Sequence, residues 1–400
     1  MPGTGRNARN AGAVGFLVAA TLAVGDSAAA APSPINLQTT GGHQSWAVAI
    51  NSSDTSVGYT DQVRSSNHVP AQWDRTGRLT PLSLPADNKG GEATGINDAG
   101  LVSGYVYGAG WIQSAVTWDK NGNRTTLPTP DSLDSIAFDV NEHGVVVGQT
   151  FQSVGGQYRA ARWVDGQVTL LAPLAGRDHS AQIALTSDDV VVGNSFTNTP
   201  GDIGRAPTRW DADGTPTALP VPDGTQRAEV DGARGSIAYG WVYTDVPGGR
   251  GYRVRWDLTH GNTMSPIVPL PGDSDAFPAG SNNRGTLIGM SRGTVSSAVK
   301  WTDANTPVRL PTFPGDQFAA AYDINDSGAV VGGSAPIGTG TDYRIVVWDP
   351  AGNLTTLKSL PFLNNSTPTR INAHDSVIGY GITYTGGIPF HRSVLWLGHP

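Results

Sequence analysis

The residues of this chain that could do chemistry are few and widely spaced. There is no cysteine among the 400 residues, which excludes disulfides, thiolate metal sites and cysteine nucleophiles. The eight histidines show no spacing typical of metal ligands, so we predict no metal site. Glutamate occurs only at positions 92, 142 and 229. The paired carboxylates of a glycosidase would have to converge from distant segments, and Glu92, just before a predicted strand, is the one glutamate that merits a test.

Two kinds of motif resemble reactive or ligand-binding loops, but ordinary turns explain them better. Gly289-Met290-Ser291-Arg292-Gly293 has the spacing of a nucleophile elbow, which requires a strand followed by a helix. In this chain the motif ends a predicted strand, and no helical pattern follows it. Residues 119–123 and 323–328 begin like calcium loops but lack the glutamate that such a loop needs at its end. We predict turns at both, with an adventitious calcium ion as the alternative, and we expect no catalytic residue and no cofactor.

A set of longer loops carries aromatic residues together with arginine, the residue types enriched at binding hot spots. Variable loops on a rigid scaffold are where recognition usually takes place. We therefore predict ligand binding, with an alternative in which the aromatic side chains only cover the edges of the structure. The candidate ligand-binding residues are Tyr107, Trp111, Tyr158, Arg159, Trp241, Tyr243, Tyr252, Arg344 and Arg392.

Eight tryptophans divide the chain into similar units, and these units must position the loops. An Asn-turn-Val-Gly pattern precedes most of them, although Thr186 and Asp231 replace the asparagine in the fourth and fifth units. Self-similarity at a period of about 40–50 residues is typical of repeat architectures. The tryptophans recur every 45 to 48 residues, at Trp73, Trp118, Trp163, Trp210, Trp256, Trp301, Trp348 and Trp396.

One unit, residues 93–127, shows the expected structure most clearly. Residues 93–97, 101–105, 115–118 and 124–127 have the composition of short strands, and turns rich in Gly, Asn and Asp separate the first pair and the last pair. Four strands in about 46 residues match one blade of a β-propeller. The tryptophan in the third strand is large enough to fill the space between neighbouring blades.

We predict an all-β protein, an eight-bladed β-propeller of four-stranded antiparallel blades. The last unit lacks a fourth strand, and residues 34–37 resemble one, so we expect an N-terminal strand to complete the last blade and close the ring. An open solenoid of the same units is the alternative. The predicted blades are residues 43–82, 92–128, 135–172, 180–220, 227–270, 276–311, 318–358 and 367–397, the last with 34–37.

The repeated pattern resembles the HAF-repeat family of secreted bacterial proteins. The best matches to the pattern are Phe138 to Gly148 and Tyr322 to Gly332. The His-Ala-Phe tripeptide that names the family is absent, and Ser114-Ala115-Val116 holds its place in one unit. The resemblance implies an extracellular, β-propeller-like repeat protein of undefined activity, and it supplies no catalytic residues.

The N-terminus is typical of a secretory signal. Arg6 and Arg9 precede an apolar stretch that is too short to span a bilayer, and small residues at 27–31 offer cleavage sites. We predict a signal peptide at residues 1–30, one domain at 31–400, and a secreted, extracellular bacterial protein without a membrane span. A net charge of −7 argues against a nucleic-acid partner, and we expect a monomer.

Taken together, these patterns favour a secreted, non-catalytic binding or scaffold propeller. It would recognise a polysaccharide, a cell-envelope component or a secreted protein through one loop face. The alternative is an extracellular hydrolase or lyase with a site at the channel mouth. Convergence of two carboxylates, or of a histidine with a carboxylate, at the channel mouth would favour the enzyme, and a bare channel with an aromatic rim would favour binding.

Overall fold

Antiparallel β-strands make up almost all of the regular structure, in agreement with an all-β protein. The computed structural model describes residues 32–41, 44–61, 67–87, 89–130, 132–152, 156–197, 204–244, 251–302, 305–336, 343–385 and 387–398. The predicted signal peptide (1–30), the predicted start of the first blade at His43, and the chain end at 399–400 lie outside the described residues. Among the described residues, no helix is both long enough and apolar enough to cross a membrane.

The strands form eight groups of four, which we number sheets 1 to 8. Sheet 1 contains β2 (Ser45–Ile50), β3 (Ser56–Asp61), β4 (His68–Trp73) and β5 (Leu79–Pro81). Sheet 2 contains β6 (Gly90–Ile96), β7 (Val102–Tyr107), β8 (Gln113–Trp118) and β9 (Arg124–Thr126), with the short 3-10 helix η1 (Ala109–Trp111) between β7 and β8. Sheet 3 contains β10 (Ser132–Val140), β11 (Val146–Gln152), β12 (Tyr158–Val164) and β13 (Gln167–Leu171). Sheet 4 contains β14 (His179–Leu185), β15 (Val191–Phe196), β16 (Arg205–Trp210) and β17 (Pro216–Ala218).

The second half of the chain repeats this plan. Sheet 5 contains β18 (Thr225–Arg234), β19 (Ile237–Thr244), β20 (Tyr252–Asp257) and β21 (Thr263–Pro266). Sheet 6 contains β22 (Asp275–Ser281), β23 (Leu287–Arg292), β24 (Ser296–Trp301) and β25 (Pro307–Arg309). Sheet 7 contains β26 (Phe318–Ile324), β27 (Val330–Ala335), β28 (Arg344–Trp348) and β29 (Leu354–Leu357), and one parallel bridge joins it to sheet 6. Sheet 8 contains β30 (Asn364–Ile371), β31 (Val377–Thr385), β32 (Ile388–Trp396) and the N-terminal β1 (Ile35–Asn36).

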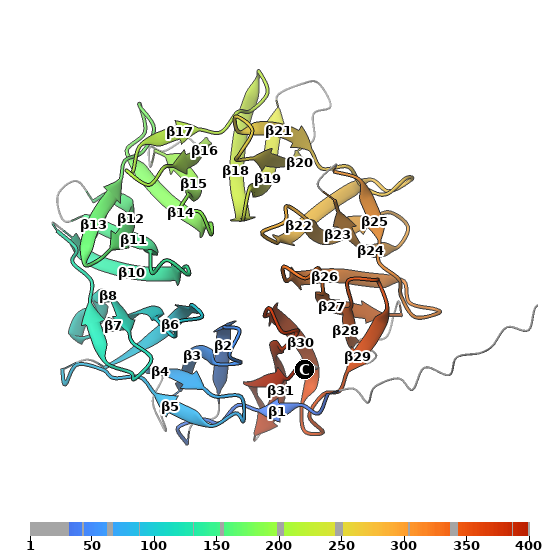
Figure 1. Cartoon of the computed structure of the whole chain (residues 1–400), viewed down its shortest axis with the longest axis horizontal. Coiled ribbons are helices and arrows are strands. Elements are labelled where there is room, and N and C mark those ends of the chain that lie inside the picture. The colour runs from blue at the N-terminus through green and yellow to red at the C-terminus, as the bar shows by residue number, and fades with distance from the viewer. Residues whose placement is uncertain are drawn as a thin grey trace, which may run out of the picture. The chain divides into compact units, whose positions relative to one another are not determined.

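The sheets are arranged around a common centre, with the first strand of each sheet innermost (Figure 1). Because the strands are antiparallel, the links between first and second strands leave on one side, which we call the turn face. The loops between second and third strands, and the connections from one sheet to the next, leave on the other side, which we call the loop face. The sheets therefore present two chemically separate surfaces.

The repeated tryptophans hold each sheet to the connection that enters it. All eight are buried, with at most 1% of their surface exposed. Each indole N–H also donates a hydrogen bond to a backbone carbonyl, as from Trp118 to Ser83 at 2.8 Å and from Trp301 to Val268 at 2.7 Å. A buried indole N–H without a partner would be unfavourable, so this bond fixes the path of the connection.

Every first strand contains a β-bulge at the same place, opposite a glycine of the second strand. In sheet 3 the register shifts between Ala137 and Asp139, and Gly148 pairs with Ala137. A Cβ atom on Gly148 would lie 1.9 Å from the carbonyl oxygen of Ile136, so only glycine fits. The repeated Val-Gly pattern therefore marks a close approach of two backbones. A bulge also changes the direction of the side chains that follow it.

The repeated asparagines link neighbouring sheets on the turn face. The Asn97 side-chain oxygen accepts the N–H of Leu101, which closes its own turn, and its Nδ2 donates to the carbonyl of Asn141 in the next sheet at 2.9 Å. Asn325 makes the same contact to Asn372 at 2.8 Å. The sequence predicts the first of these interactions, and the structure adds the second, which crosses between sheets.

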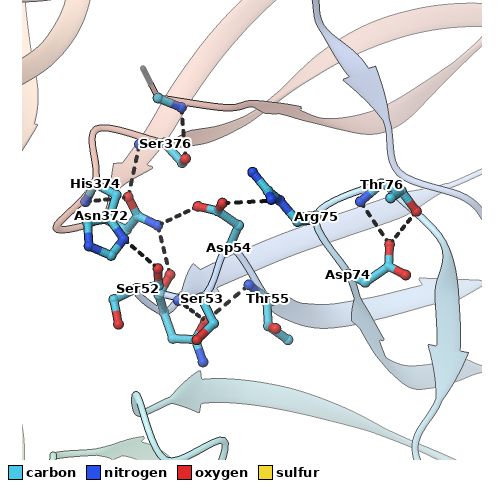
Figure 2. A network of polar contacts seen from close by, with 12 residues as sticks. Ser52, Ser53, Asp54, Thr55, Asp74, Arg75, Thr76, Asn372, His374 and Ser376 are labelled. Atoms are coloured by element: carbon cyan, nitrogen blue, oxygen red, sulfur yellow. Dashed lines mark hydrogen bonds and ion pairs between the residues drawn. The ribbon is translucent and has the colours of Figure 1, made fainter. Parts of the chain in front are cut away.

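The last sheet makes this contact with the first sheet (Figure 2). Nδ2 of Asn372 donates to the carbonyl of Asn51 at 2.8 Å and to Oδ1 of Asp54 at 3.0 Å, and His374 contacts the carbonyl of Ser52 at 2.7 Å. Sheet 8 thus contacts sheet 1 in the way that sheets 2 and 7 contact their neighbours.

The N-terminal strand pairs with the last strand. Ile35 lies opposite Leu395 and Asn36 opposite Val394, so β1 is the fourth strand of sheet 8, as residues 34–37 were expected to be. Gln38, which follows β1, accepts the indole N–H of Trp73 at 2.7 Å. The carbonyl of Gln38 lies in the connection that enters sheet 1, just as the carbonyls that accept the other indole N–H groups lie in the connections that enter their sheets.

The strand boundaries differ from the predicted ones by a few residues. The first strand of the unit at 93–127 begins at Gly90, and its second strand continues to Tyr107. Glu92, predicted to precede the strand, therefore lies inside it. Composition did not indicate that the strand begins at Gly90, because glycine, which occupies positions 90 and 91, is uncommon within strands.

Candidate functional site

The closest contact between a histidine and a carboxylate in the described chain lies on the loop face, where sheets 1 and 2 meet. His68 opens β4 and Glu92 lies in β6, two strands that pack against each other (Figure 1). Nδ1 of His68 is 2.6 Å from Oε1 of Glu92. The exposed fractions of the two side chains are 33% and 23%. The pair is therefore shielded from bulk water and still reachable from it.

Three tyrosines surround this pair. The ring of Tyr59 stacks on the imidazole of His68, with 4.1 Å between the ring centres. Tyr105 lies opposite Glu92 in the β6–β7 ladder, and its hydroxyl hydrogen-bonds the carboxylate. The hydroxyl of Tyr107 accepts the backbone N–H of His68 at 2.9 Å. These contacts hold the first residue of β4 in a fixed place.

The tyrosines remain neutral over a wide pH range. Burial, with the negative charge of Glu92 as a second cause, raises the pKa of Tyr59 to about 12. The same two causes raise the pKa of Tyr105. Burial also raises the pKa of Tyr107, although the N–H of His68 opposes the rise. Near neutral pH, then, the three phenols are hydrogen-bond donors, and Glu92 supplies the negative charge.

An open aromatic surface lies beside the pair. Trp111 is 60% exposed, and its ring stacks on Tyr107 with 5.0 Å between centres. Its backbone φ is 64°, a left-handed conformation that costs a residue other than glycine on the order of 1–3 kcal/mol. Strain of this kind occurs most often at functional sites. The η1 turn therefore presents a large aromatic face to solvent, and Tyr107 links that face to the backbone of His68.

The arrangement can move a proton. An ionised carboxylate only accepts hydrogen bonds, so Glu92 favours the tautomer of His68 that carries its proton on Nδ1. Nε2 is then left with a lone pair, which suits it to act as a general base. The charge of Glu92 also stabilises the imidazolium that forms when Nε2 takes up a proton. No group of three or more potential metal ligands occurs among the described residues.

Some of the residues predicted to bind ligand come together at this pair and at one other place. Tyr107 and Trp111 lie at the His68–Glu92 pair, as described above. Trp241 and Tyr252 line a cavity of about 470 Å³ between sheets 5 and 6. The guanidinium of Arg227 lies 5.1 Å from the centre of the Trp241 ring. Tyr243 lies in the same strand as Trp241 and is 40% exposed.

The other predicted residues lie apart from these two places. Tyr158 is 42% exposed in sheet 3, and the guanidinium of Arg159 donates to the carbonyl of Asp178. Arg344 forms an ion pair at 2.6 Å with Asp316, whose side chain is fully buried, so its guanidinium supports the packing of sheet 7. Arg392 donates to Thr39 at 3.4 Å, and burial lowers its pKa.

The sequence analysis singled out Glu92 but missed its partner, His68. A signal for the pair does exist in the repeat. Arg205 opens the third strand of sheet 4, and its guanidinium lies 3.8 Å from Glu229 in the first strand of sheet 5. His68 and Arg205 thus hold the same position in their units, as do Glu92 and Glu229. Alignment of each third strand with the following first strand would have placed His68 beside Glu92.

The motifs that resemble reactive loops lie in ordinary repeat structure. Ser291, the serine of the Gly-x-Ser-x-Gly segment, is fully buried in β23, and its hydroxyl donates to Asp273 at 2.7 Å. Oδ1 of Asp119 accepts the backbone N–H groups of Asn121 and Asn123, both at 2.9 Å, in a tight turn.

Comparison with solved structures identifies the same fold in longer proteins. A post-proline-cleaving enzyme from Rickettsia typhi matches with a TM-score of 0.52 and 10% identity, over 84% of this chain and 57% of that one. Prolyl oligopeptidase B from Galerina marginata matches with 0.54 and 12%, over 85% and 55%. A structure from an analysis of two prolyl endopeptidases matches with 0.54 and 11%, over 88% and 54%. This chain spans little more than half the length of these proteins, and at such identities the likeness establishes the fold alone.

No protein-family model matches the chain, and no curated protein matches it. The resemblance to HAF-repeat proteins therefore stays a prediction. The expected non-catalytic binding or scaffold function, by contrast, is wrong by these comparisons, because the solved structures that share the fold are peptidases. The names of these structures agree better with the alternative, a hydrolase. His68 and Glu92 do bring a histidine to a carboxylate, but they do so between two sheets on the loop face and not at the channel mouth, where the enzyme was expected to have its site.

Proposed function

We propose that this protein is an extracellular hydrolase that cleaves peptides, and that His68 and Glu92 handle the proton in that reaction. The observation that carries the proposal is the 2.6 Å contact between the half-buried imidazole and carboxylate, beside an exposed tryptophan. The solved structures with this fold, which are named as prolyl or post-proline-cleaving peptidases, support a peptide substrate. The substrate class therefore rests on the comparison, and the acid–base pair rests on this chain's own residues.

The reaction follows from the positions of the two ring nitrogens. Nε2 of His68 takes a proton from a water molecule while the water oxygen bonds to the carbonyl carbon of the peptide. The imidazolium then gives that proton to the leaving nitrogen as the C–N bond breaks. The products are a carboxylic acid and an amine, and His68 is neutral again. Glu92 is a positioning residue, because it acts through His68 and stabilises its charged form.

The exposed ring of Trp111 supplies a surface for a substrate side chain. Aromatic faces bind flat or ring-shaped groups through dispersion and burial of apolar area. A prolyl or aromatic side chain would stack on Trp111 while the bond to be cleaved lies toward His68. Tyr107 supports the ring of Trp111 from beneath and holds the backbone of His68, so it couples the two parts of the site.

The test is hydrolysis of internally quenched peptides, with and without proline, by the protein that begins at Ala31. His68→Ala should lower kcat by about 10²–10⁴-fold, the usual contribution of a general base. Glu92→Gln should lower kcat with KM unchanged, since it affects only the protonated state of His68. A purely structural role of Glu92 would instead change thermal stability and KM together.

A matched control exists on the turn face. His143 contacts Asp189 at 3.0 Å, but its side chain is 62% exposed and no aromatic surface lies beside it among the described rings. His143→Ala should keep full activity. The proposal fails if no peptide is cleaved above the buffer rate, or if His68→Ala and His143→Ala are equally active.

We also propose that the eight sheets form a closed, eight-bladed β-propeller, completed by β1. The support is the pairing of β1 with β32 and the contact of Asn372 with the carbonyl of Asn51. Removal of residues 31–38 should lower the free energy of unfolding by several kcal/mol, because it exposes an edge strand and removes the buried Leu37. Removal of residues 399–400 is the control and should have no effect. If the protein without residues 31–38 melts like the intact protein, an open array is correct.

Export remains a proposal that rests on residues 1–30 alone. The intact mass of protein recovered from the culture medium should correspond to a chain that begins near Ala31. A chain that begins before Phe16 would contradict a signal peptide.

A further inference from the structure

A cavity of about 530 Å³ lies at the common centre, on the side of the turn face. All eight sheets line it with residues of their first strands and the turns that follow. Its size is that of a site for a small molecule. It is separate from the His68–Glu92 pair, because neither residue lines it.

One position of the repeat sets the charge of this cavity. The residue that follows the β-bulge in each first strand is small in five sheets, which leaves the centre open. In the other three sheets it carries a charge. The small residues are Ala49, Gly95, Ala184, Gly232 and Gly280, and the charged residues are Asp139, Asp323 and Arg370. A repeat that needed only an open centre would have a small residue throughout. Asp323 accepts the N–H of Ile371, so Asp139 and Arg370 are the departures that point to a ligand.

Most of the carboxylates around the cavity already bind protein groups. On the rim, Asp98, Glu142 and Asp326 each accept a backbone N–H from a neighbouring turn, at 2.7–2.9 Å. Deeper in, Asp231 pairs with Arg253 at 2.6 Å, and Asp323 accepts the N–H of Ile371 at 2.9 Å. Four of these groups are part of the contacts between sheets, and Asp231 pairs within sheet 5.

Three charged groups remain available to a ligand. Asp139 is open to the cavity, and among the described residues its carboxylate accepts only the adjacent N–H of Val140 at 2.9 Å. The cavity is also lined by Arg234, which makes no ion pair within the described chain, and by Arg370, whose guanidinium donates to one backbone carbonyl. The three residues come from sheets 3, 5 and 8 and line the same cavity.

The surroundings of Asp139 agree with a bound cation. Oδ1 of Asp139 lies 2.9 Å from the position that a Cβ atom would occupy if residue 95 were not glycine. Gly95 in sheet 2 therefore leaves room for this carboxylate. Although the side chain is open to the cavity, the surrounding protein raises its pKa, and the N–H of Val140, Arg234 and Arg370 oppose that rise. A positive group of a ligand in the cavity would reach this carboxylate and stabilise its charge.

A buried hydroxyl supplies an independent sign of a ligand. Ser281 lines the cavity with 4% of its surface exposed, and its Oγ has no hydrogen-bond partner among the described residues. A buried hydroxyl without a partner is unfavourable. A polar ligand in the cavity would supply the missing partner.

We propose that this cavity binds a small zwitterion, an α-amino acid or a dipeptide. Arg234 and Arg370 receive its carboxylate, and Asp139 receives its ammonium group. Guanidinium groups suit a carboxylate because their N–H donors match its two oxygens. The proposal does not depend on the peptidase activity, since it involves other residues on the opposite face.

The test is titration calorimetry with glycylproline and with free proline. The protein is the His68→Ala variant, which prevents turnover of the dipeptide by the proposed hydrolase. At least one of the two zwitterions should bind at millimolar concentration or better. N-acetylproline, which lacks the ammonium group, and prolinamide, which lacks the carboxylate, should each bind at least tenfold more weakly than proline.

Variants of the cavity must change this binding selectively. Arg370→Gln and Arg234→Gln should each weaken binding about tenfold, and Asp139→Asn should remove the preference for proline over N-acetylproline. Arg124→Gln on the outer strand β9 and Asp213→Asn on an exposed turn are the matched controls and should bind as the parent does. Absence of heat with both zwitterions, or equal binding in the cavity variants and their controls, would overturn the proposal and leave the hydrolase proposal untouched.

Discussion

The turn face and the loop face contain the same kind of polar pair in different settings. On the turn face, His143 of sheet 3 contacts Asp189 of sheet 4 at 3.0 Å. The same oxygen of Asp189 accepts a hydrogen bond at 2.6 Å from Nδ2 of Asn141, which also belongs to sheet 3. On the loop face, His68 contacts Glu92 at 2.6 Å, and tyrosines instead of repeat contacts surround the pair. The first pair belongs to the network that joins sheets. The second serves no contact that the repeat requires.

This difference teaches how a repeat protein separates stability from function. Groups that recur in most units, such as the turn asparagines, hold neighbouring sheets together. Groups that occur in few units are not needed for that purpose. A basic residue paired with a glutamate at these positions is found as His68 with Glu92 and as Arg205 with Glu229, and only the first pair has a histidine. In a repeat fold a polar group that breaks the pattern is therefore the better candidate for chemistry.

The largest effect on stability should come from the turn-face network. Asn325 is 2% exposed; its Nδ2 donates to Asn372 and Asp375, and its oxygen accepts N–H groups of its own turn. Asn325→Ala should lower the free energy of unfolding by about 2–4 kcal/mol, because buried groups lose their partners. Chemical denaturation checks this. Asn353→Ala, at an exposed turn, should change stability by less than about 0.5 kcal/mol, and peptide hydrolysis should survive both changes.

A smaller effect should come from the carboxylate of the turn-face pair. Asp189→Ala removes two hydrogen bonds and places alanine at a φ of 63°, so we expect a loss of about 1–2 kcal/mol. Asp188→Ala, the exposed neighbour, is the control. If Asp189→Ala lowered hydrolysis as strongly as Glu92→Gln does, the separation between the two faces would be wrong.

Alkaline pH should lower stability in part through Tyr59 on the loop face. In the unfolded chain Tyr59 ionises near its ordinary pKa of 10.0, whereas in the folded protein its pKa is raised to about 12. Between these values the unfolded state gives up a proton that the folded state keeps, so stability falls as pH rises from about 10 to about 12. Unfolding measured at several pH values should show a shallower decline in Tyr59→Phe. An identical decline in the variant would show that Tyr59 ionises freely.

The smallest effect on stability should come from Trp111. Its side chain is 60% exposed and its backbone conformation is strained, so Trp111→Ala should change the free energy of unfolding by less than about 1 kcal/mol. Loss of the stacking surface should raise KM about tenfold with kcat unchanged. Steady-state kinetics and thermal melts check both points. A loss of stability as large as that of Trp118→Ala, whose side chain is fully buried, would mean that Trp111 is a packing residue.

Local patterns predicted much of the fold. The tryptophan period, the turn asparagines and the Val-Gly pairs gave the eight four-stranded units, and residues 34–37 were expected to pair with the last unit, where β1 is found. These patterns were informative because each reflects a local requirement that recurs, such as a turn or a close backbone approach. The donation from Nδ2 of Asn97 to Asn141 was not predictable, because it depends on how neighbouring sheets pack.

The candidate site was only partly predictable, for a similar reason. Trp111 and Glu92 were named from residue type and scarcity. His68 was one of eight histidines without a metal-like spacing, and nothing in its own unit marks it. Its role depends on a contact with the next unit, which becomes visible only when the third strand of one unit is aligned with the first strand of the next, as for Arg205 and Glu229.

The pairing of β1 with β32 has a consequence for how the protein folds. Ile35 meets Leu395 across nearly the whole length of the chain. Contacts between such distant residues carry a large entropic cost of loop closure and form slowly. During synthesis, residues 35 and 36 leave the ribosome long before their partner strand, β32, is made. Until β1 and β32 pair, the edge of β32 is open to strands of other chains. The final step of folding is therefore the one most exposed to aggregation.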